Sequence, residues 1–245
     1  METNGQRQGA GAIEAKRGIR QQVKSARQGL SLSYREAASR RIRQHVLLWL
    51  EHRPAGTVFC YVSDELEPDT RPLMEELLSR GIRVCVPRCC SGGVMEAVPV
   101  PSLSVLVPGR FGIPEPGEEL PSTPADRVDV CIVPCLSAGR DGGRLGHGMG
   151  YYDRWLAGFT GTALCLCFDA LCRENLPMEE TDRPMDALVT EEGVFACGTC
   201  PMETEQRAGS MWRFPCFRKV KGERTKTETE AVKSRFSGSH SGKQK

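Results

Sequence analysis

The sequence lacks long apolar runs. Its 245 residues contain no stretch of 18 or more apolar side chains, so we expect no transmembrane helix. Residues 1–12 are polar and have no apolar segment, which excludes a secretory signal peptide. Together these two absences predict a soluble, cytoplasmic protein with no membrane partner. No apolar stripe stands out on the predicted surface, so we expect a monomer.

The chain also has little net charge and few aromatic residues. It is 39% hydrophobic, 26% charged and 6% aromatic, a composition that suits one globular domain of ordinary size. The net charge of +2 hides two different parts: residues 207–245 have 11 Lys or Arg against 3 Glu, a net of +8, and the rest has a net of -6. We therefore predict a domain over residues 12–196 and a basic, disordered tail over 197–245.

Histidine is scarce, with 4 residues, whereas cysteine is abundant, with 12. Many cysteines, such as Cys60, Cys131 and Cys165, lie in apolar runs, and we interpret them as reduced, buried thiols rather than disulfides. Cys197 and Cys200 have the spacing of half a zinc site or a redox pair. The only histidine after them is His240, so we favour plain thiols.

Apolar periodicity predicts alternating helices and strands. We expect a basic helix over residues 12–30, a helix with a capping box from Ser33 to Glu36, and a helix through Leu78 that Thr70 caps and Gly81 ends. Apolar, β-prone runs predict strands over residues 57–62, 82–87, 94–98, 128–136, 162–168 and 187–190. This order indicates an α/β fold: a three-layer α/β/α domain with a mostly parallel central sheet.

One glycine-rich loop carries the chemical signal. It reads GRDGGRLGHGMGYYD over residues 139–153, and it lies between a predicted central strand and a helix that begins near Tyr151. Bare backbone N–H groups at such a place favour an anion, most often phosphate. Arg144 could add a forked cationic contact, and Asp153 is an oxygen ligand suited to magnesium.

Two common phosphate loops do not match. A dinucleotide fingerprint from Gly146 needs a small residue where Tyr151 stands, and a Walker loop from Gly143 needs Lys and Ser or Thr where Met149 and Gly150 stand. The remaining alternatives are a third kind of phosphate loop or a tight glycine turn without a ligand. The interleaved Arg144, His147 and Asp153 favour the phosphate loop.

The loop resembles the signature of the 5-formyltetrahydrofolate cyclo-ligase family, also called methenyltetrahydrofolate synthetase. Four weaker motifs occur in the family's order over about residues 14–195: Lys16-x-x-x-Arg20, Ser63-x-x-x-Glu67, Phe111-Gly-Ile-Pro-Glu-Pro116, and Asp182-x-x-x-Asp186 followed by Val189-Thr-Glu191. The resemblance implies an enzyme that uses ATP and Mg²⁺ to convert 5-formyltetrahydrofolate into 5,10-methenyltetrahydrofolate through a phosphorylated formyl intermediate, with release of ADP and phosphate.

The resemblance also implies roles for individual residues. ATP would be held by Lys16, Arg20, Gly143, Arg144, Leu145, Gly146, His147, Gly148, Met149, Gly150 and Tyr151. The folate would be held by Val62, Glu67, His147, Gly148, Met149, Gly150, Tyr151 and Tyr152. Arg144, Tyr151 and Asp153 would act in catalysis, and Asp153 and Asp186 would hold magnesium.

Each role has a plainer alternative. Lys16 and Arg20 could be solvated on one helix face, Asp182 and Asp186 could be a surface pair, and the two tyrosines could only pack the helix start. The chain also departs from the family: Ala138-Gly139 stand where members have Phe-Asp, and Met149 stands where members have Gly or Lys.

These departures and the basic tail keep other functions open. One alternative is a non-catalytic relative that binds nucleotide or folate and docks its tail to a nucleic acid or an acidic partner. Another is an isomerase or CoA-transferase-like activity on a similar scaffold, which would not need ATP. A solvated tail with no set partner remains the preferred interpretation of residues 197–245.

Overall fold

Seven strands form one central sheet in the computed structural model, which describes residues 4–179 and 182–197. Their order is β11-β10-β9-β6-β1-β2-β3. The inner strands pair in parallel, whereas β3 and β11 pair antiparallel at the two edges. The strands are β1 (Thr57–Cys60), β2 (Arg83–Cys89), β3 (Met95–Val100), β6 (Val130–Val133), β9 (Thr162–Leu166), β10 (Ala187–Thr190) and β11 (Gly193–Ala196). The predicted mostly parallel sheet is confirmed.

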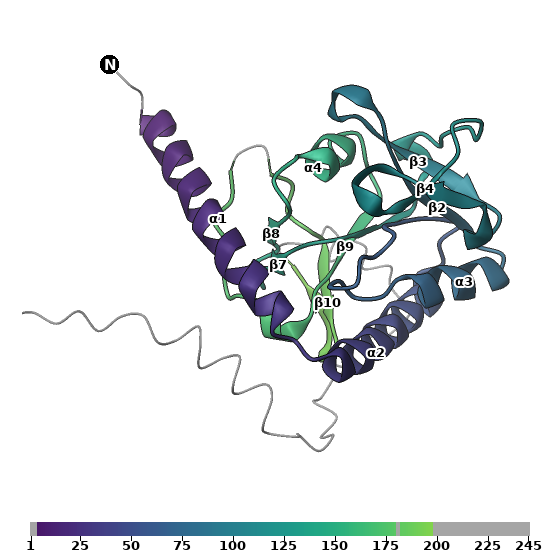
Figure 1. Cartoon of the computed structure of the whole chain (residues 1–245), viewed down its shortest axis with the longest axis horizontal. Helices are drawn as coiled ribbons and strands as arrows, with labels where there is room; N and C mark the ends of the chain where they lie inside the picture. The colour runs from purple at the N-terminus through teal and green to yellow at the C-terminus, as the bar shows by residue number, and fades with distance from the viewer. Residues whose placement is uncertain (1–3, 180–181, 198–245) are drawn as a thin grey trace, which may run out of the picture. The chain divides into compact units, whose positions relative to one another are not determined.

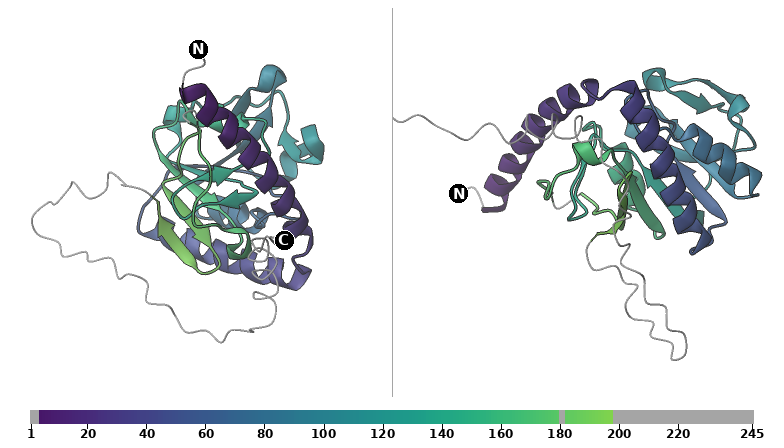
Figure 2. Two further views of the ribbon diagram at one scale, coloured as in Figure 1. Left: turned by 90° about the vertical axis from the view of Figure 1, so that its left-hand side faces the viewer. Right: turned by 90° about the horizontal axis from the view of Figure 1, so that it is seen from below.

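Helices cover both faces of this sheet (Figures 1 and 2). α2 (Leu32–Glu51) packs against β10 and β11, and α3 (Arg71–Ser79) packs against β2. α4 (Tyr151–Leu156) lies on the opposite side in Figure 1, where the ring of Trp155 is 4.5 Å from that of Phe59 in β1. Every residue of β1, β6 and β10 is buried, as expected for central strands covered on two faces.

The connections reverse direction between β1 and β6. From β1 the chain continues to β2 on one side, and from β6 it continues to β9 on the other, while β1 and β6 pair directly through Val58 and Val130. In open α/β sheets, ligands bind at the carboxyl ends of the two strands where this reversal occurs. The topology therefore predicts a binding site after Cys60 and Val133.

Helix α1 (Asn4–Gln28) lies along this carboxyl edge and joins the loops that follow the two strands. Arg20 Nε donates to Gly146 O at 3.0 Å, and Arg27 Nε donates to Leu66 O at 3.2 Å. Lys16, Val23 and Arg27 are buried, so this face of the basic helix packs against the domain instead of facing water.

Two small sheets complete the described elements. β4 (Leu106–Pro108) and β5 (Pro114–Pro116) form a hairpin, and β7 (Ser137–Ala138) pairs with β8 (Arg144–Leu145) around the start of the glycine loop. Neither pair, nor edge strand β11, was among the predicted strands, because each is very short and its apolar pattern is weak.

Two predicted helix caps are wrong. The N-cap of α2 is Ser31, whose hydroxyl accepts the N–H of Tyr34 at 3.2 Å, so the Ser33–Glu36 capping box does not form. Thr70 does precede α3, but its hydroxyl donates to Tyr61 O at 2.7 Å instead of capping the helix. Burial explains the second difference, because Tyr61 O follows a buried strand and needs a partner.

The predicted tail lies outside the described residues from position 198 onward. Within the described ranges, all ten cysteines are free thiols, in agreement with the prediction of reduced side chains. Over the same ranges, no helix combines the length and hydropathy that a membrane crossing requires.

Candidate active site

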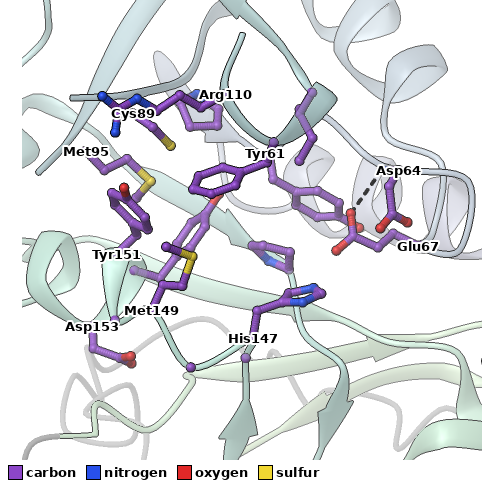
Figure 3. A pocket seen from close by; sticks show the side chains of 18 of the residues that line it. Tyr61, Asp64, Glu67, Cys89, Met95, Arg110, His147, Met149, Tyr151 and Asp153 are labelled. Carbon is purple, nitrogen blue, oxygen red and sulfur yellow. Dashed lines mark hydrogen bonds between the residues drawn. The ribbon is translucent and has the colours of Figure 1, made fainter. Parts of the chain in front are cut away.

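A cavity of about 370 Å³ opens at the carboxyl ends of β1, β2 and β6. Its walls come from α1, the loop after β1, the hairpin β4–β5 and the glycine loop (Figure 3). In Figure 3, Tyr61, Asp64 and Glu67 gather at one end, and Met149, Tyr151 and Asp153 lie at the other. A volume of this size suits a small organic ligand.

The glycine loop needs glycine at two positions in particular. Gly148 and Gly150 have φ values of 96° and 68°, which side chains other than glycine rarely adopt. A Cβ atom on Gly150 would also stand 2.7 Å from Arg154 Nη1, and that guanidinium donates to Met149 O at 2.9 Å. The backbone thus turns tightly at Gly148 and Gly150, and both residues line the cavity.

Arg144 and Tyr152 each carry a buried polar atom without a hydrogen-bond partner among the described residues. Arg144 Nη2 donates to Asp153 Oδ1 at 2.6 Å and Nη1 donates to Pro134 O at 3.3 Å. Arg144 Nε and Tyr152 Oη are buried and have no hydrogen-bond partner among the described residues. Because unsatisfied buried polar groups are costly, two of them beside one cavity indicate a polar ligand.

Lys16 is buried beside two carboxylates. Its ammonium pairs with Glu179 Oε1 at 2.6 Å and with Asp182. Burial by itself would lower the pKa of Lys16, but the hydrogen bonds and charges of Asp182 and Glu179 outweigh it and raise that pKa. The side chain therefore stays cationic at the cavity wall, where Arg20 and Arg144 add two further positive charges.

Glu67 is a buried acid at the other end of the cavity. Its carboxyl accepts the N–H of Asp64 at 3.1 Å. Burial, and then the charge of Asp64, raise the pKa of Glu67 to about 7. Near neutral pH this group is partly protonated, so it can donate a hydrogen bond as well as accept one.

His147 faces the same end. Partial burial, followed by the positive charge of Arg27, lowers the pKa of His147 below its ordinary value. Its ring is therefore neutral at pH 7, so it is suited to hydrogen bonding with a ligand and adds no fixed positive charge to the site.

An apolar rim borders the cavity mouth, formed by Phe111, Met149 and Tyr151. Phe111 is 60% exposed and Met149 is 53% exposed. The Phe111 ring lies edge-on to that of Tyr151, with centroids 6.2 Å apart. Phe111 has a φ of 61°, and this left-handed conformation costs a residue other than glycine about 1–2 kcal/mol.

Most of the predicted site residues line this one cavity. They are Lys16, Arg20, Val62, Glu67, Arg144, Gly146, His147, Gly148, Met149, Gly150, Tyr151, Tyr152 and Asp153. Gly143 and Leu145 do not line it: the Gly143 N–H donates to Asp141 Oδ1 at 2.9 Å, and Leu145 is buried in the core.

Asp186 is not brought to the cavity. Its carboxylate accepts the Ala163 N–H at 2.7 Å, beside the amino end of β9, which is the opposite edge of the sheet. Asp182, four residues earlier, is the acidic residue of this segment that lines the cavity. The two aspartates are equivalent in sequence pattern, and only the path of the chain distinguishes them.

Several lining residues were not predicted from the sequence. The second wall of the cavity comes from the end of β2, from β3 and from the hairpin β4–β5, and it contributes Pro87, Cys89, Met95, Arg110, Phe111, Ile113 and Glu115. Phe111–Pro116 is recognisable as a sequence motif, but its place beside the glycine loop depends on tertiary packing.

Asp141 bears on the family departure at Gly139. A Cβ atom on Gly139 would overlap Asp141 Oδ1, which already accepts the Gly143 N–H. The carboxylate of Asp141 thus fills the space where a side chain at position 139 would begin. Asp141, two positions after Gly139, therefore compensates for part of this departure from the family pattern.

The donor set fits a nucleotide with its cation better than a metal held by the protein alone. Among the described residues, no group of three His, Cys, Asp or Glu side chains could hold a metal ion. Two of the carboxylates that line the cavity are paired with lining cations, Asp153 with Arg144 and Asp182 with Lys16. Mg²⁺ in phosphate-transfer sites needs only one or two carboxylates, because phosphate oxygens and waters supply the other ligands.

Comparisons with known proteins agree with this geometry. The 5-formyltetrahydrofolate cyclo-ligase of Escherichia coli strain K12 is 35% identical over 147 residues, which cover 58% of this chain and 81% of that protein. The structure of Aquifex aeolicus 5,10-methenyltetrahydrofolate synthetase matches with a TM-score of 0.65 and 30% identity, covering 79% of this chain and 99% of that one. The Mycoplasma pneumoniae 5,10-methenyltetrahydrofolate synthetase, at 21% identity and a TM-score of 0.60, shares the fold.

A family model covers most of the domain that contains the cavity. Residues 12–191 match the model of the 5-formyltetrahydrofolate cyclo-ligase family. That range includes the glycine loop, α1 from residue 12 onward and both walls of the cavity. The chain therefore belongs to the 5-formyltetrahydrofolate cyclo-ligase family of enzymes.

Proposed function

We propose that this protein converts 5-formyltetrahydrofolate into 5,10-methenyltetrahydrofolate at the expense of ATP, releasing ADP and phosphate. The observation that supports this most is the division of one cavity into two ends. The cations Lys16, Arg20 and Arg144 lie beside the glycine loop, and the buried acid Glu67 lies at the other end. Such a cavity accommodates a polyanion and a neutral, hydrogen-bonding ring system together.

The reaction that we propose has two steps. The formyl oxygen attacks the γ-phosphorus of ATP, so ADP departs and the formyl carbon becomes an activated, phosphorylated imidate. The N10 atom of the folate then attacks that carbon and gives up its proton, the carbon–oxygen bond breaks, and the departing phosphate takes that proton with it as the methenyl bridge closes. The protein contributes mainly by positioning both substrates and by neutralising phosphate charge.

The described residues support a role for each end. Lys16, Arg20 and Arg144 would hold the phosphates together with the N–H groups of Gly146, Gly148 and Gly150. Arg144 lines the cavity, and its buried Nε has no hydrogen-bond partner among the described residues. At the other end, Glu67 and His147 would hydrogen-bond the pterin, and Tyr152 Oη would reach a substrate oxygen.

We propose that Mg²⁺ accompanies the nucleotide, held by Asp153 and phosphate oxygens. Asp182 replaces Asp186 as the second carboxylate in this proposal, because only Asp182 lines the cavity. When bound, the cation would neutralise phosphate charge. Arg144 holds Asp153 in place with a hydrogen bond of 2.6 Å.

The direct test is a spectrophotometric assay of the methenyl product. Purified full-length protein should form that coloured product from 5-formyltetrahydrofolate only when both ATP and Mg²⁺ are present, with ADP in equal amount. Product without ATP, or no product at high enzyme concentration, would overturn the proposal. An isomerase or CoA-transferase-like activity would show no nucleotide dependence.

A binding protein without turnover was the other interpretation of the sequence. That interpretation had two grounds: the altered Ala138-Gly139 segment and the tail. Asp141 occupies the space beside Gly139, which weakens the first ground. The second is tested by deleting residues 207–245. Turnover that survives the deletion supports the enzyme with a dispensable tail, whereas a loss of turnover contradicts that assignment. The free thiols support the proposal that the protein acts in the reducing cytoplasm.

A further inference from the structure

We propose that Cys167 and Cys172 form a reversible oxidation site, at which hydrogen peroxide joins the two thiols in a disulfide. The bond would pull on the base of the glycine loop, because Cys172 lies in a segment that is hydrogen-bonded to β7. Formation of the disulfide is independent of the proposed function, and only its effect on turnover rests on that function.

Four cysteines gather at the carboxyl end of β9. Cys165 lies in that strand and Cys167 directly follows it. Both side chains interact with that of Cys135, which comes from the loop after β6. Cys167 also interacts with the side chain of Cys172. The thiols therefore form a connected cluster and are not isolated apolar fillers of the core.

Within this cluster, Cys167 and Cys172 are the pair placed for a disulfide. Their Sγ atoms donate to the same carbonyl oxygen, that of Phe168, at 3.5 Å and 3.6 Å. The turn Asp169–Leu171 brings the chain back, and the Cys172 N–H donates to Asp169 O at 3.0 Å. Because a disulfide holds its sulfur atoms about 2 Å apart, this short loop must close further when the bond forms.

The two thiols differ in access. Cys172 is partly exposed, whereas Cys167 is buried. The hydrogen bonds with Cys135 and Cys172, and then burial, raise the pKa of the Cys167 thiol. Cys167 thus keeps its proton and is a poor target for peroxide, because the thiolate is the reactive form. Peroxide therefore meets Cys172 first.

The oxidation has two steps. The sulfur of Cys172 takes one oxygen of hydrogen peroxide, so the O–O bond breaks, a sulfenic acid forms and water leaves. The sulfur of Cys167 then attacks the sulfenic sulfur, the S–O bond breaks, and the oxygen departs as a second water with the Cys167 proton. The two thiols give up two electrons and peroxide accepts them. A dithiol restores both thiols by exchange.

The residue after Cys172 is tied to the start of the glycine loop. The Arg173 N–H donates to Ala138 O at 2.9 Å, and Arg173 O accepts the N–H of Arg140 at 3.0 Å. Ala138 belongs to β7, so the backbone on this side of Cys172 continues the small sheet from which the loop extends.

The residue before Cys172 is tied to the same strand. Leu171 O accepts the hydroxyl of Ser137, in β7, at 2.6 Å. β7 pairs with β8, which carries Arg144. Closing Cys172 onto Cys167 would therefore strain the bonds on both sides of Cys172 and shift the strand pair that positions Arg144.

The disulfide is tested by peptide mapping. The full chain is treated with hydrogen peroxide, its remaining thiols are blocked, and it is digested without reductant by a protease that cleaves before aspartate. Cleavage before Asp169 separates Cys167 from Cys172, so a bond between them links two peptides. We expect this linked pair in the mass spectrum and its loss after dithiothreitol.

Variants identify the two partners. Cys172→Ser and Cys167→Ala should each abolish the linked pair. Cys165→Ala is the matched control, because Cys165 is also buried and lies in the same peptide as Cys167, and it should leave the pair intact. Absence of the pair, its loss in Cys165→Ala alone, or oxidation confined to the partly exposed Cys89 and Cys90 would overturn the site.

Hydrogen exchange tests the link to the glycine loop. In oxidised wild type, the backbone amides of residues 137–145 should exchange about fivefold faster or more, and dithiothreitol should reverse the change. Cys172→Ser, treated in the same way, should show no change. A disulfide that forms without faster exchange there would overturn the link.

Turnover separates this proposal from the proposed function. Formation of the methenyl product should fall on oxidation and recover on reduction in wild type, but stay constant in Cys172→Ser. Absence of turnover in both redox states would refute the proposed function, while the linked peptides and the exchange rates decide the oxidation site by themselves.

Discussion

Arg144 and Asp153 form a short ion pair, 2.6 Å long, between the second small sheet and the first turn of α4. The Arg144 side chain is 6% exposed and that of Asp153 is 32% exposed, so the carboxylate is the more accessible member of the pair. Both residues line the cavity.

Replacing Asp153 should therefore separate catalysis from folding. We expect Asp153→Asn to lower kcat about 100-fold or more, because the cation would lose its charged ligand. The amide still accepts a hydrogen bond from Arg144, so the fold should persist with a modest loss of stability. Steady-state kinetics and circular dichroism check the two expectations. Asp126→Asn, at an exposed site outside the cavity, is the matched control, and full activity in Asp153→Asn would contradict the metal assignment.

Lys16 should matter for the nucleotide and not for the folate. Lys16→Met removes a buried cation and should raise the KM for ATP about tenfold or more, with little change in the KM for 5-formyltetrahydrofolate. Arg17→Met is a strict comparison, because the neighbouring side chain is 81% exposed. If both variants shift the KM for ATP equally, general surface charge and not a contact of Lys16 is responsible. The pair with Glu179 and Asp182 makes some loss of stability in Lys16→Met certain, so thermal unfolding is recorded in parallel.

Glu67 predicts a specific dependence of stability on pH. Its pKa is raised from 4.5 to about 7 by burial, so the folded state holds a proton that the unfolded state releases. The stabilisation from that proton is complete below pH 4.5 and is lost as pH rises through 7, by about 3 kcal/mol at most. Glu67→Gln should remove this loss.

Urea unfolding at pH 5 and pH 8.5 measures the effect. From pH 5 to pH 8.5, the free energy of unfolding of Glu67→Gln should increase relative to that of wild type. Glu65→Gln, at an exposed position of the same loop, should show no such increase. A parallel response in wild type and Glu67→Gln would rule out Glu67 as the titrating group.

Gly139 and Asp141 should be coupled. Gly139→Ala should destabilise the protein, because its Cβ atom would overlap Asp141 Oδ1. Asp141→Gly should cost about 1–3 kcal/mol by leaving the Gly143 N–H without its acceptor. In the double variant the added methyl group no longer meets the carboxylate, and its nearest neighbour is Leu176 N at 3.3 Å. The loss of stability in the double variant should therefore be smaller than the sum of the two single losses. Strict additivity, measured by denaturant unfolding, would show that Asp141 does not fill this space.

Sequence patterns were sufficient for six of the seven strands of the central sheet and for one wall of the site. Buried strands such as Val130–Val133 are recognisable because they are continuously apolar, and the loop ending at Asp153 is recognisable because interleaved glycine and charge are rare together. Both signals are local. The choice of Ser31 over Ser33 as helix cap is also local, but the two serines offer equivalent hydroxyls, so the pattern alone does not decide between them.

The other wall depended on contacts distant in sequence. Phe111 becomes a site residue only because Glu115 links its loop to Cys89 across 26 positions. Asp182 reaches the cavity and Asp186 does not, since the extended chain between them passes from one edge of the sheet toward the other. No periodicity records either relationship.

The pairing of β1 with β6 has a consequence for how the enzyme comes into being. Val58 and Val130 are joined in register across more than 70 positions, and the acid end and the phosphate end of the cavity follow these two strands. No continuous segment of the chain carries both ends. During synthesis, a chain that has emerged only through the hairpin β4–β5 has no active site. Docking of β6 beside β1 is a long-range closure, which slows folding, and it joins the part of the sheet that precedes it to the part that follows.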